Sequence, residues 1–384
     1  MNKFPKILCL TLLVSTPLLA STILPMNRAF TALTELLPYI QDQASFLDKS
    51  NEPQIKEKLI LLDKALTTAK HETLLKHDLF APSYALITEN INESVKAFNA
   101  GKKSYSHWML QEITTLCLDC HTRMPESHAS SFQSGELQIE PAKFKNADAL
   151  ATAQLIVRRY TDAKNTFLRE IQEKLIKKDF DNLLNPFQQI LLIDVKVQRD
   201  LDGMDKTLEL YIKKETVPEQ MKKTLKKWQK RLRFWKKDLF YKNGIRNDQE
   251  LKLFIKNKLT PLKNTGYLDD GHQVDFLMAS GLLSQYFFIN QDTTMAPEIS
   301  YWLGLLEKRL KRSNFFGSGD YFLKQCIRKY PHHPAAKECL TEYKESVEFD
   351  FSGSAGTMIP PEVQEEIDEF DKLLKGSKVK PKKR

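Results

Sequence analysis

Apolar residues recur along most of this chain at spacings of three and four, which places them on one face of an α-helix. Prolines near several segment starts and a glycine at one segment end are ordinary helix boundary signals. Short connections predict that neighbouring helices run antiparallel and pack side by side. Before residue 126 we expect four helices, at Pro25 to about Leu47, Pro53 to Thr73, Pro82 to Gly101, and Tyr105 to Met124.

The helical pattern resumes near Asn146 and continues to about Phe349. Consecutive helices with short turns are typical of an α-solenoid. The chain shows no strand-like alternation of apolar and polar residues, so the predicted fold class is all-α. In this second part we expect helices at 146–160, 162–179, 183–201, 203–215, 217–242, 247–260, 272–289, 296–312, 318–330 and 334–347.

These patterns divide the chain of 384 residues into successive regions. A polar, serine-containing stretch separates the two helical parts, and a glycine- and proline-containing break follows the second part. A short acidic amphipathic helix and a basic end come last. The predicted division is 1–21 as a signal peptide, 22–125 as a four-helix domain, 126–145 as a linker, 146–349 as a helical repeat domain, and 350–384 as a flexible linker, short helix and basic tail.

The first residues have the pattern of a secretory signal peptide. Lys3 and Lys6 form a basic start, and the stretch from Ile7 to Ala20 is mostly apolar. Cleavage is expected near Ala20 or Ser21, which also removes Cys9. No other stretch approaches the 18 apolar residues of a membrane span, so no transmembrane segment is predicted.

The strongest chemical motif is Cys117-Leu118-Asp119-Cys120-His121. The spacing C-x-x-C-H is the attachment pattern of c-type haem. Two thiols at this spacing reach two vinyl groups of one porphyrin and form thioethers, and the histidine that follows supplies an axial ligand to the iron. The motif therefore predicts one covalently bound haem c with its iron. An exported, periplasmic chain is the setting in which such attachment is expected.

Other interpretations of the motif are a dithiol redox pair, half of a zinc site, or chance. A zinc site usually needs a second Cys or Cys/His pair, and the chain has no second C-x-x-C. A dithiol redox motif is expected near a βαβ pattern, which this helical sequence does not show. Covalent haem is the favoured interpretation.

The four-helix region resembles the cytochrome c-prime family and its low-spin relatives. Those proteins are four-helix bundles with C-x-x-C-H late in the last helix, where Cys117 to His121 lie here. The family usually has an aromatic residue and then an arginine after the haem histidine. This chain has Arg123 two residues after His121 but lacks the aromatic residue. The resemblance implies that Arg123 pairs with a haem propionate.

The sixth iron ligand stays open at this stage. The resemblance implies Met26, because low-spin relatives take a methionine near the start of the first helix. A vacant site and a histidine (His71 or His77) are the alternatives. His107 is excluded, since it precedes His121 by 14 residues on one helix, roughly 21 Å at 1.5 Å per residue. A methionine ligand suits electron transfer, whereas an open site suits gas binding.

The remaining cysteines, Cys326 and Cys339, flank a turn that contains Pro331 and Pro334. An antiparallel helix pair hinged at this turn brings two α-carbons within disulfide range, and an oxidising compartment favours the bond. We therefore predict a Cys326–Cys339 disulfide. The alternative is a pair of small buried residues between packed helices.

The last part of the repeat region resembles tetratricopeptide repeats. Tyr301-Trp302-Leu303-Gly304 contains the Leu-Gly pair of a first repeat helix. A second helix ends at Tyr330-Pro331, and Pro334 opens the next. The resemblance implies a concave surface that binds another protein. We expect a redox partner protein to dock there.

The segment Lys222–Lys237 contains nine basic residues and no acidic ones. It is predicted to be a basic amphipathic helix, either with a solvated face or as a docking site for an acidic partner or an anionic surface. Its apolar stripe consists of Met221, Leu225, Trp228, Leu232, Trp235 and Leu239.

The formal charge of +9, or +7 after loss of the signal peptide, does not make nucleic acid an expected partner in a periplasm. No catalytic constellation is evident, so we expect an electron carrier and not an enzyme. The predicted function is single-electron transfer by a periplasmic c-type cytochrome. A haem-based gas sensor with an open sixth site and a non-redox scaffold are the alternatives.

Overall fold

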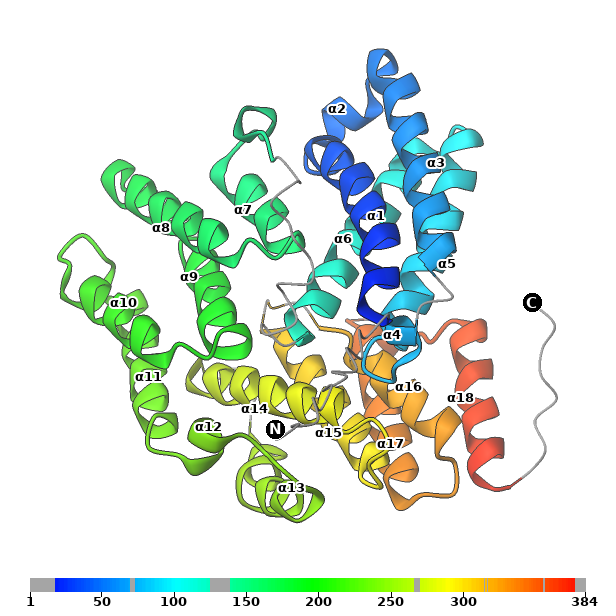
Figure 1. Ribbon diagram of the computed structural model, residues 1–384, viewed down its shortest axis with the longest axis vertical. Helices are drawn as coiled ribbons and strands as arrows, with labels where there is room; N and C mark the ends of the chain where they lie inside the picture. The colour runs from blue at the N-terminus through cyan, green and yellow to red at the C-terminus, as the bar shows by residue number, and fades with distance from the viewer. Residues whose placement is uncertain are drawn as a thin grey trace, which may run out of the picture.

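The computed structural model describes residues 18–69, 73–124, 139–265, 270–313, 315, 317–354 and 356–376. These residues are almost entirely helical, which confirms the all-α prediction (Figure 1). Within them the strands are β1 (Ser352–Gly353) and β2 (Gly356–Thr357), an antiparallel hairpin that pairs Ser352 with Thr357. The hairpin lies inside the glycine- and proline-containing stretch that was predicted to be a flexible linker. The sequence pattern did not indicate any regular structure there.

The long helices before residue 124 pack side by side, each against the next long helix in the chain. Helix α1 packs on α3, α3 on α5, and α5 on α6. Buried leucine, isoleucine and phenylalanine side chains at helical spacing fill the space between them. The elements of this part are α1 (Leu18–Ile40), α2 (Gln43–Leu47), η1 (Lys49–Asn51), α3 (Glu52–Ala69), α4 (Thr73–Lys76), α5 (Ala81–Asn99) and α6 (Lys103–Arg123).

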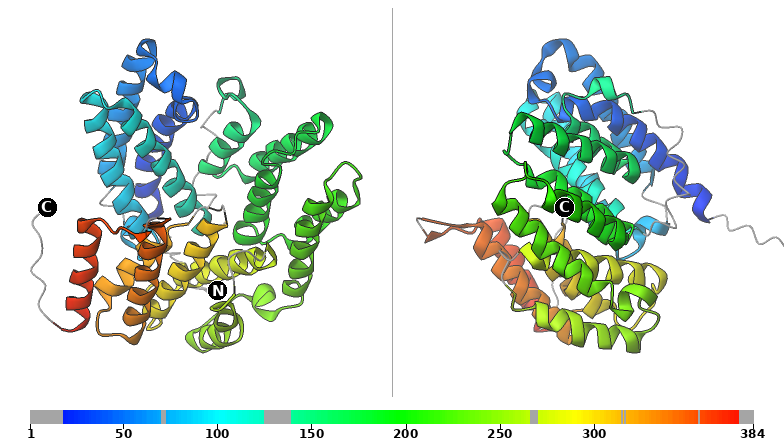
Figure 2. Two further views of the ribbon diagram at one scale, coloured as in Figure 1. Left: turned by 180° about the vertical axis from the view of Figure 1, so that it is seen from behind. Right: turned by 90° about the vertical axis from the view of Figure 1, so that its left-hand side faces the viewer.

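Helices α7 to α18 follow an arc, and helices α1 to α6 lie between the two ends of this arc (Figures 1 and 2). Helix α6 contacts α7 near one end of the arc, and α5 contacts α16 near the other. The helices of the arc are α7 (Ala147–Ile156), α8 (Tyr160–Lys177), α9 (Leu184–Leu191), α10 (Leu201–Lys213), α11 (Glu219–Trp235), α12 (Leu239–Asn243), α13 (Asp248–Phe254), α14 (Asp270–Ile289), α15 (Ala296–Arg312), α16 (Gly319–Lys329), α17 (Pro334–Asp350) and α18 (Pro361–Leu374).

Short non-α segments interrupt this arc. The π-helical turns are Leu192–Val197, which continues α9, and Ile255–Leu259, which continues α13. Two 3-10 turns lie at Pro141–Lys143 and Thr260–Leu262. As a result, the α-helical parts are shorter than the helices predicted at 183–201 and 247–260. The sequence did not reveal this, because apolar periodicity does not distinguish a π-turn from an α-turn over one or two turns.

One continuous core joins the two halves of the chain. Buried side chains from α1 to α6 belong to the same packed cluster as those from α7 to α18. Polar contacts also cross between the halves: Lys329 Nζ and Tyr330 Oη both donate to the Asp78 carboxylate in the loop before α5. The chain therefore folds with its two predicted regions in close contact.

Cys326 on α16 and Cys339 on α17 form a disulfide bond, as predicted from the sequence. Their α-carbons are 6.5 Å apart, and both residues are fully buried. The bond closes the turn between two antiparallel helices. It also attaches α17 to α16, which itself packs on α5.

Replacing Cys326 and Cys339 together with alanine is expected to lower the free energy of unfolding by about 3 kcal/mol, because a loop of this length loses its cross-link in the unfolded chain. Denaturant unfolding with and without reductant measures this effect. Reductant should lower the stability of the native chain and leave the double variant unchanged. Equal stability of the two chains under oxidising conditions would contradict the prediction.

Among the described residues, each helix is too short or too polar to span a lipid bilayer. The predicted signal peptide lies largely outside the described residues, as do most of the predicted linker and the end of the basic tail.

Candidate functional site

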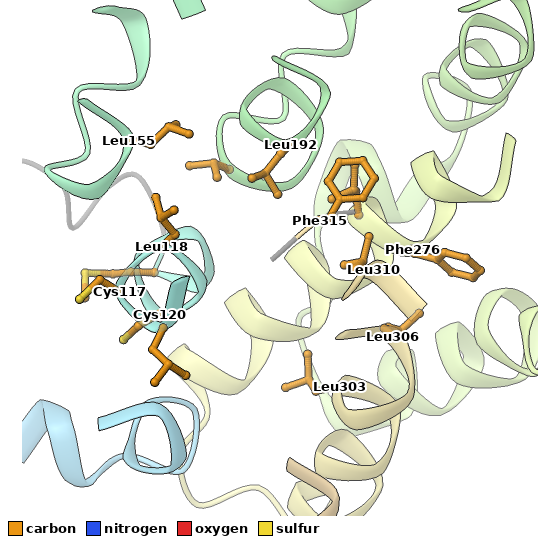
Figure 3. Packing of buried hydrophobic residues seen from close by; sticks show 14 of the residues in the cluster. Cys117, Leu118, Cys120, Leu155, Leu192, Phe276, Leu303, Leu306, Leu310 and Phe315 are labelled. Atoms are coloured by element: carbon orange, nitrogen blue, oxygen red, sulfur yellow. The ribbon is translucent and has the colours of Figure 1, made fainter. Parts of the chain in front are cut away.

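The C-x-x-C-H motif occupies the last turns of α6, where Cys117, Cys120 and His121 are all buried. Spacings of three and four residues place the three side chains on one face of the helix. Figure 3 shows both sulfur atoms on the side of α6 that faces away from Leu303 and Leu306. The three side chains line a single cavity at the centre of the first helices.

The wall of this cavity is almost wholly apolar. The cavity volume is about 30 Å³, far below the about 300–1,000 Å³ that sites for organic ligands usually measure. A porphyrin would have to push these walls apart to enter. The lining residues are Met26, Ala29, Phe30, Leu33, Leu62, Leu66, Leu75, Tyr84, Ile87, Ile113, Cys117, Cys120 and His121.

Both motif thiols are free of any disulfide. Burial raises the pKa of the Cys117 thiol to about 12 and that of Cys120 to about 11. Both groups therefore carry their protons at neutral pH. Dithiol redox centres depend on a thiol with a lowered pKa, because the thiolate is the reactive form. This environment is unsuited to thiolate redox chemistry.

His121 is held in one tautomer by a contact from the second half of the chain. Its Nδ1 atom lies 2.6 Å from the carbonyl oxygen of Ile156 at the end of α7. Because a carbonyl only accepts hydrogen bonds, Nδ1 carries the proton and Nε2 carries the lone pair. Among the described residues, no hydrogen bond is made to Nε2. The Phe30 ring lies edge-on to the imidazole, with centroids 5.0 Å apart.

The imidazole of His121 is neutral in this site. Burial, together with the nearby positive charge of Arg158, lowers its pKa to about 3. A neutral imidazole with one nitrogen bonded to a carbonyl and the other open is the form in which histidine binds metal ions.

Met26 lines the same cavity as the motif residues, about two turns into α1. Tyr84 also lines it, and its hydroxyl donates to the carbonyl oxygen of Leu66. His77 does not line the cavity: its Nδ1 accepts from the Leu79 amide, and its ring stacks near Phe288. The other candidate histidine, His71, lies outside the described residues.

His107 lies at the other end of α6, as its sequence distance from His121 predicts. Its Nε2 contacts the carbonyl oxygen of Ile40 at 2.7 Å, and its ring packs on Phe46. His107 therefore belongs to the packing between α6 and the end of α1.

Arg123 lies in a buried polar cluster and does not line the cavity. Its guanidinium pairs with Asp119 and donates to the Leu79 carbonyl oxygen at 2.7 Å, to Ser83 Oγ at 2.6 Å and to Ser318 Oγ at 3.2 Å. A propionate contact would require this cluster to open. The cluster joins α6 to the start of α16.

The sequence pattern did not indicate the residues that hold His121 from the second half of the chain. Ile156 contributes a backbone atom, which leaves no signature in its residue type. Tyr160 donates its hydroxyl to the carbonyl oxygen of His121 at 3.1 Å. In the sequence, Tyr160 is only an aromatic residue at a helix start, which is too common a feature to indicate a contact with His121.

The predicted basic helix is present as α11, and its apolar stripe is buried at Leu225, Trp228, Leu232 and Trp235. Leu239, the last member of the predicted stripe, is 70% exposed. It lies in α12, because a turn at Lys236–Asp238 ends the stripe.

Comparisons with protein-family models, with curated proteins and with solved structures found no match. Within the described ranges, no group of three or more His, Cys, Asp or Glu side chains is arranged to hold a metal ion. A haem iron needs only one or two protein ligands, so this finding leaves the haem interpretation untouched.

Proposed function

We propose that this chain is an exported c-type cytochrome that binds one haem covalently and transfers single electrons. The main support for this proposal is that two thiols free of any disulfide and a histidine with an open Nε2 line one apolar cavity. In this proposal residues 22–125 form a cytochrome c-prime-like four-helix domain, and residues 146–349 form a tetratricopeptide-like solenoid that docks a redox partner. The bound haem supplies a one-electron iron couple.

The residues of the cavity have separate tasks in this proposal. Cys117 and Cys120 would each hold the haem through one thioether, the sulfur and its hydrogen adding across one vinyl double bond so that no atom leaves. His121 would bind the iron through Nε2, the ring nitrogen that carries the lone pair. The apolar side chains of α1, α3 and α5 exclude water from the group, which protects the site from side reactions.

Two alternatives fit the site less well. A dithiol redox centre is disfavoured by the raised pKa of both thiols. A zinc site would need further ligands near the motif, which the described residues do not bring there. The thioether chemistry uses the thiols without requiring a stable thiolate in the folded chain.

The pairing of the cysteines supports a periplasmic location. Cys326 and Cys339 are bonded, as expected in an oxidising compartment. Cys117 and Cys120 are not, although they lie close together on one helix face.

The packing of α15 and α16 supports the repeat interpretation. A β-carbon on Gly304 would lie 2.5 Å from Leu323 Cδ2 and 2.7 Å from Leu323 Cγ, so a larger residue would force the buried Leu323 side chain to move. In the last part of the arc, helices contact one another in sequence order, as α14–α15, α15–α16 and α16–α17 do. Both features are expected of stacked helical repeats.

Met26 is expected to be the sixth ligand, since it lines the cavity with His121. The reduced native protein should show a low-spin absorption spectrum, and Met26→Ala should convert it to a high-spin spectrum that shifts with carbon monoxide. Leu75→Ala, which alters the same wall without a sulfur ligand, is the matched control. A native protein that is already high-spin and binds carbon monoxide would favour the gas-sensor alternative.

The exposed face of α11 is the proposed contact for an acidic redox partner. Lys223, Lys226, Lys230 and Lys237 are exposed and make no salt bridge with any described residue. Reversing Lys223, Lys226 and Lys230 to glutamate should slow reduction of the haem by native periplasmic extract about tenfold or more at low salt. The difference should disappear at high salt, because exposed charges are screened. Equal reduction rates of the native and the charge-reversed protein at low salt would show that the exposed face of α11 does not bind the partner.

A further inference from the structure

The turn between α7 and α8 has a backbone conformation that leaves one carbonyl oxygen open. Arg158 adopts a left-handed backbone conformation with φ 61°. Its amide donates to the carbonyl oxygen of Leu155, and the Arg159 amide donates to the carbonyl oxygen of Gln154. This pairing ends α7 in a Schellman motif. The carbonyl of Ile156 is left without a backbone donor in the described structure, as is usual for the last carbonyls of a helix.

That open carbonyl is the one that accepts from His121. The Nδ1–O distance of 2.6 Å is short for an N–H···O bond, and both groups are buried. The carbonyl also belongs to the C-terminal end of α7, where the helix dipole concentrates negative charge. Both effects draw the Nδ1 proton toward α7 and increase the electron density on Nε2.

Two more contacts hold the end of α6 on the same turn. Tyr160 Oη donates to the carbonyl oxygen of His121 at 3.1 Å. Arg158 Nη2 donates to the carbonyl oxygen of Met124 at 3.2 Å, and Nη1 lies 2.7 Å from its sulfur. The side chains of Arg158 and Tyr160 are buried, so these contacts are shielded from water.

We propose that the α7–α8 turn is an integral part of the haem site, with Arg158 and Tyr160 as positioning residues that hold the axial histidine. The inference rests on the proposed function and adds that the repeat region tunes the iron ligand directly. Hydrogen bonds to the second nitrogen of a metal-bound histidine fix its orientation and raise its basicity. A more basic ligand favours the oxidised iron, so the turn lowers the reduction potential.

The test compares the reduction potentials of purified, haem-containing variants by spectroelectrochemistry. Arg158→Val is expected to raise the potential, because a β-branched residue does not tolerate this left-handed conformation and displaces the Ile156 carbonyl. A tenfold loss of preference for the oxidised form corresponds to about 59 mV for one electron. Arg158→Gly keeps the backbone conformation and should shift the potential less.

Lys178→Val is the matched control, since Lys178 has φ 55° at the end of α8 but is exposed and makes no contact with His121. It should leave the potential unchanged. If Arg158→Val does not accumulate, Tyr160→Phe decides the question, because it removes a single hydroxyl and should still raise the potential.

The inference is overturned if Tyr160→Phe and every accumulating Arg158 variant keep the native potential while retaining covalent haem. In that outcome the proposed function survives. A native chain without haem would instead overturn the proposed function and the inference together, so the two failures are distinguishable.

Discussion

Replacing Cys117 and Cys120 together with alanine is expected to abolish covalent haem attachment to the exported chain. The two thiols are the only groups in the cavity able to form thioethers with vinyl carbons. The double variant should lose the haem mass in a denatured sample and the haem-dependent peroxidase stain on a denaturing gel. The expected loss is complete, because no other bond would hold the group after denaturation.

Single alanine variants provide a graded comparison. Cys117→Ala and Cys120→Ala should each retain one thioether and less haem than the native chain. The double alanine variant of Cys326 and Cys339 is the matched control, since it removes two cysteines that form a disulfide far from the motif in sequence. It should keep its covalent haem. A haem stain that persists in Cys117→Ala/Cys120→Ala would contradict the assignment of the thiols.

Replacing Lys196 with methionine is expected to lower the free energy of unfolding by about 3–5 kcal/mol, the usual cost of stranding a buried charge. Lys196 Nζ lies 2.8 Å from Glu307 Oε1, and both side chains are fully buried. Ser280 also donates to Glu307. The other oxygen of Glu307 has no hydrogen-bond partner among the described residues, so the carboxylate depends on Lys196. Denaturant unfolding measures the loss.

The double variant Lys196→Met/Glu307→Leu is expected to recover most of this stability, because two apolar side chains replace the buried pair. Lys213→Met removes one partner of an exposed ion pair with Glu209 and should change stability little. A loss in Lys196→Met no larger than that in Lys213→Met would show that the buried pair is not needed.

The helices that surround the cavity were largely predictable from sequence. Apolar spacing and the boundary residues Pro82 and Gly101 placed the third helix close to α5, which spans Ala81–Asn99. These signals are local, because helix capping and amphipathicity involve residues a few positions apart. The Cys326–Cys339 disulfide was predictable for the same reason, since a single turn separates its two helices.

The candidate site was predictable only in part. The motif identified Cys117, Cys120 and His121, but the contacts of Arg123 and His121 with the second half of the chain were not predictable. Arg123 meets Ser318 across 195 residues of sequence, and His121 meets a backbone atom of Ile156. Residue types and spacing carry no information about which distant segment supplies a carbonyl or a hydroxyl.

The most direct test of the account is the mass of the mature chain after export by a host able to attach haem. A proteolytic peptide that contains Cys117 to His121 should carry the added mass of one haem, and the purified protein should be coloured. An unmodified peptide from a colourless protein, obtained from that same host, would contradict the account.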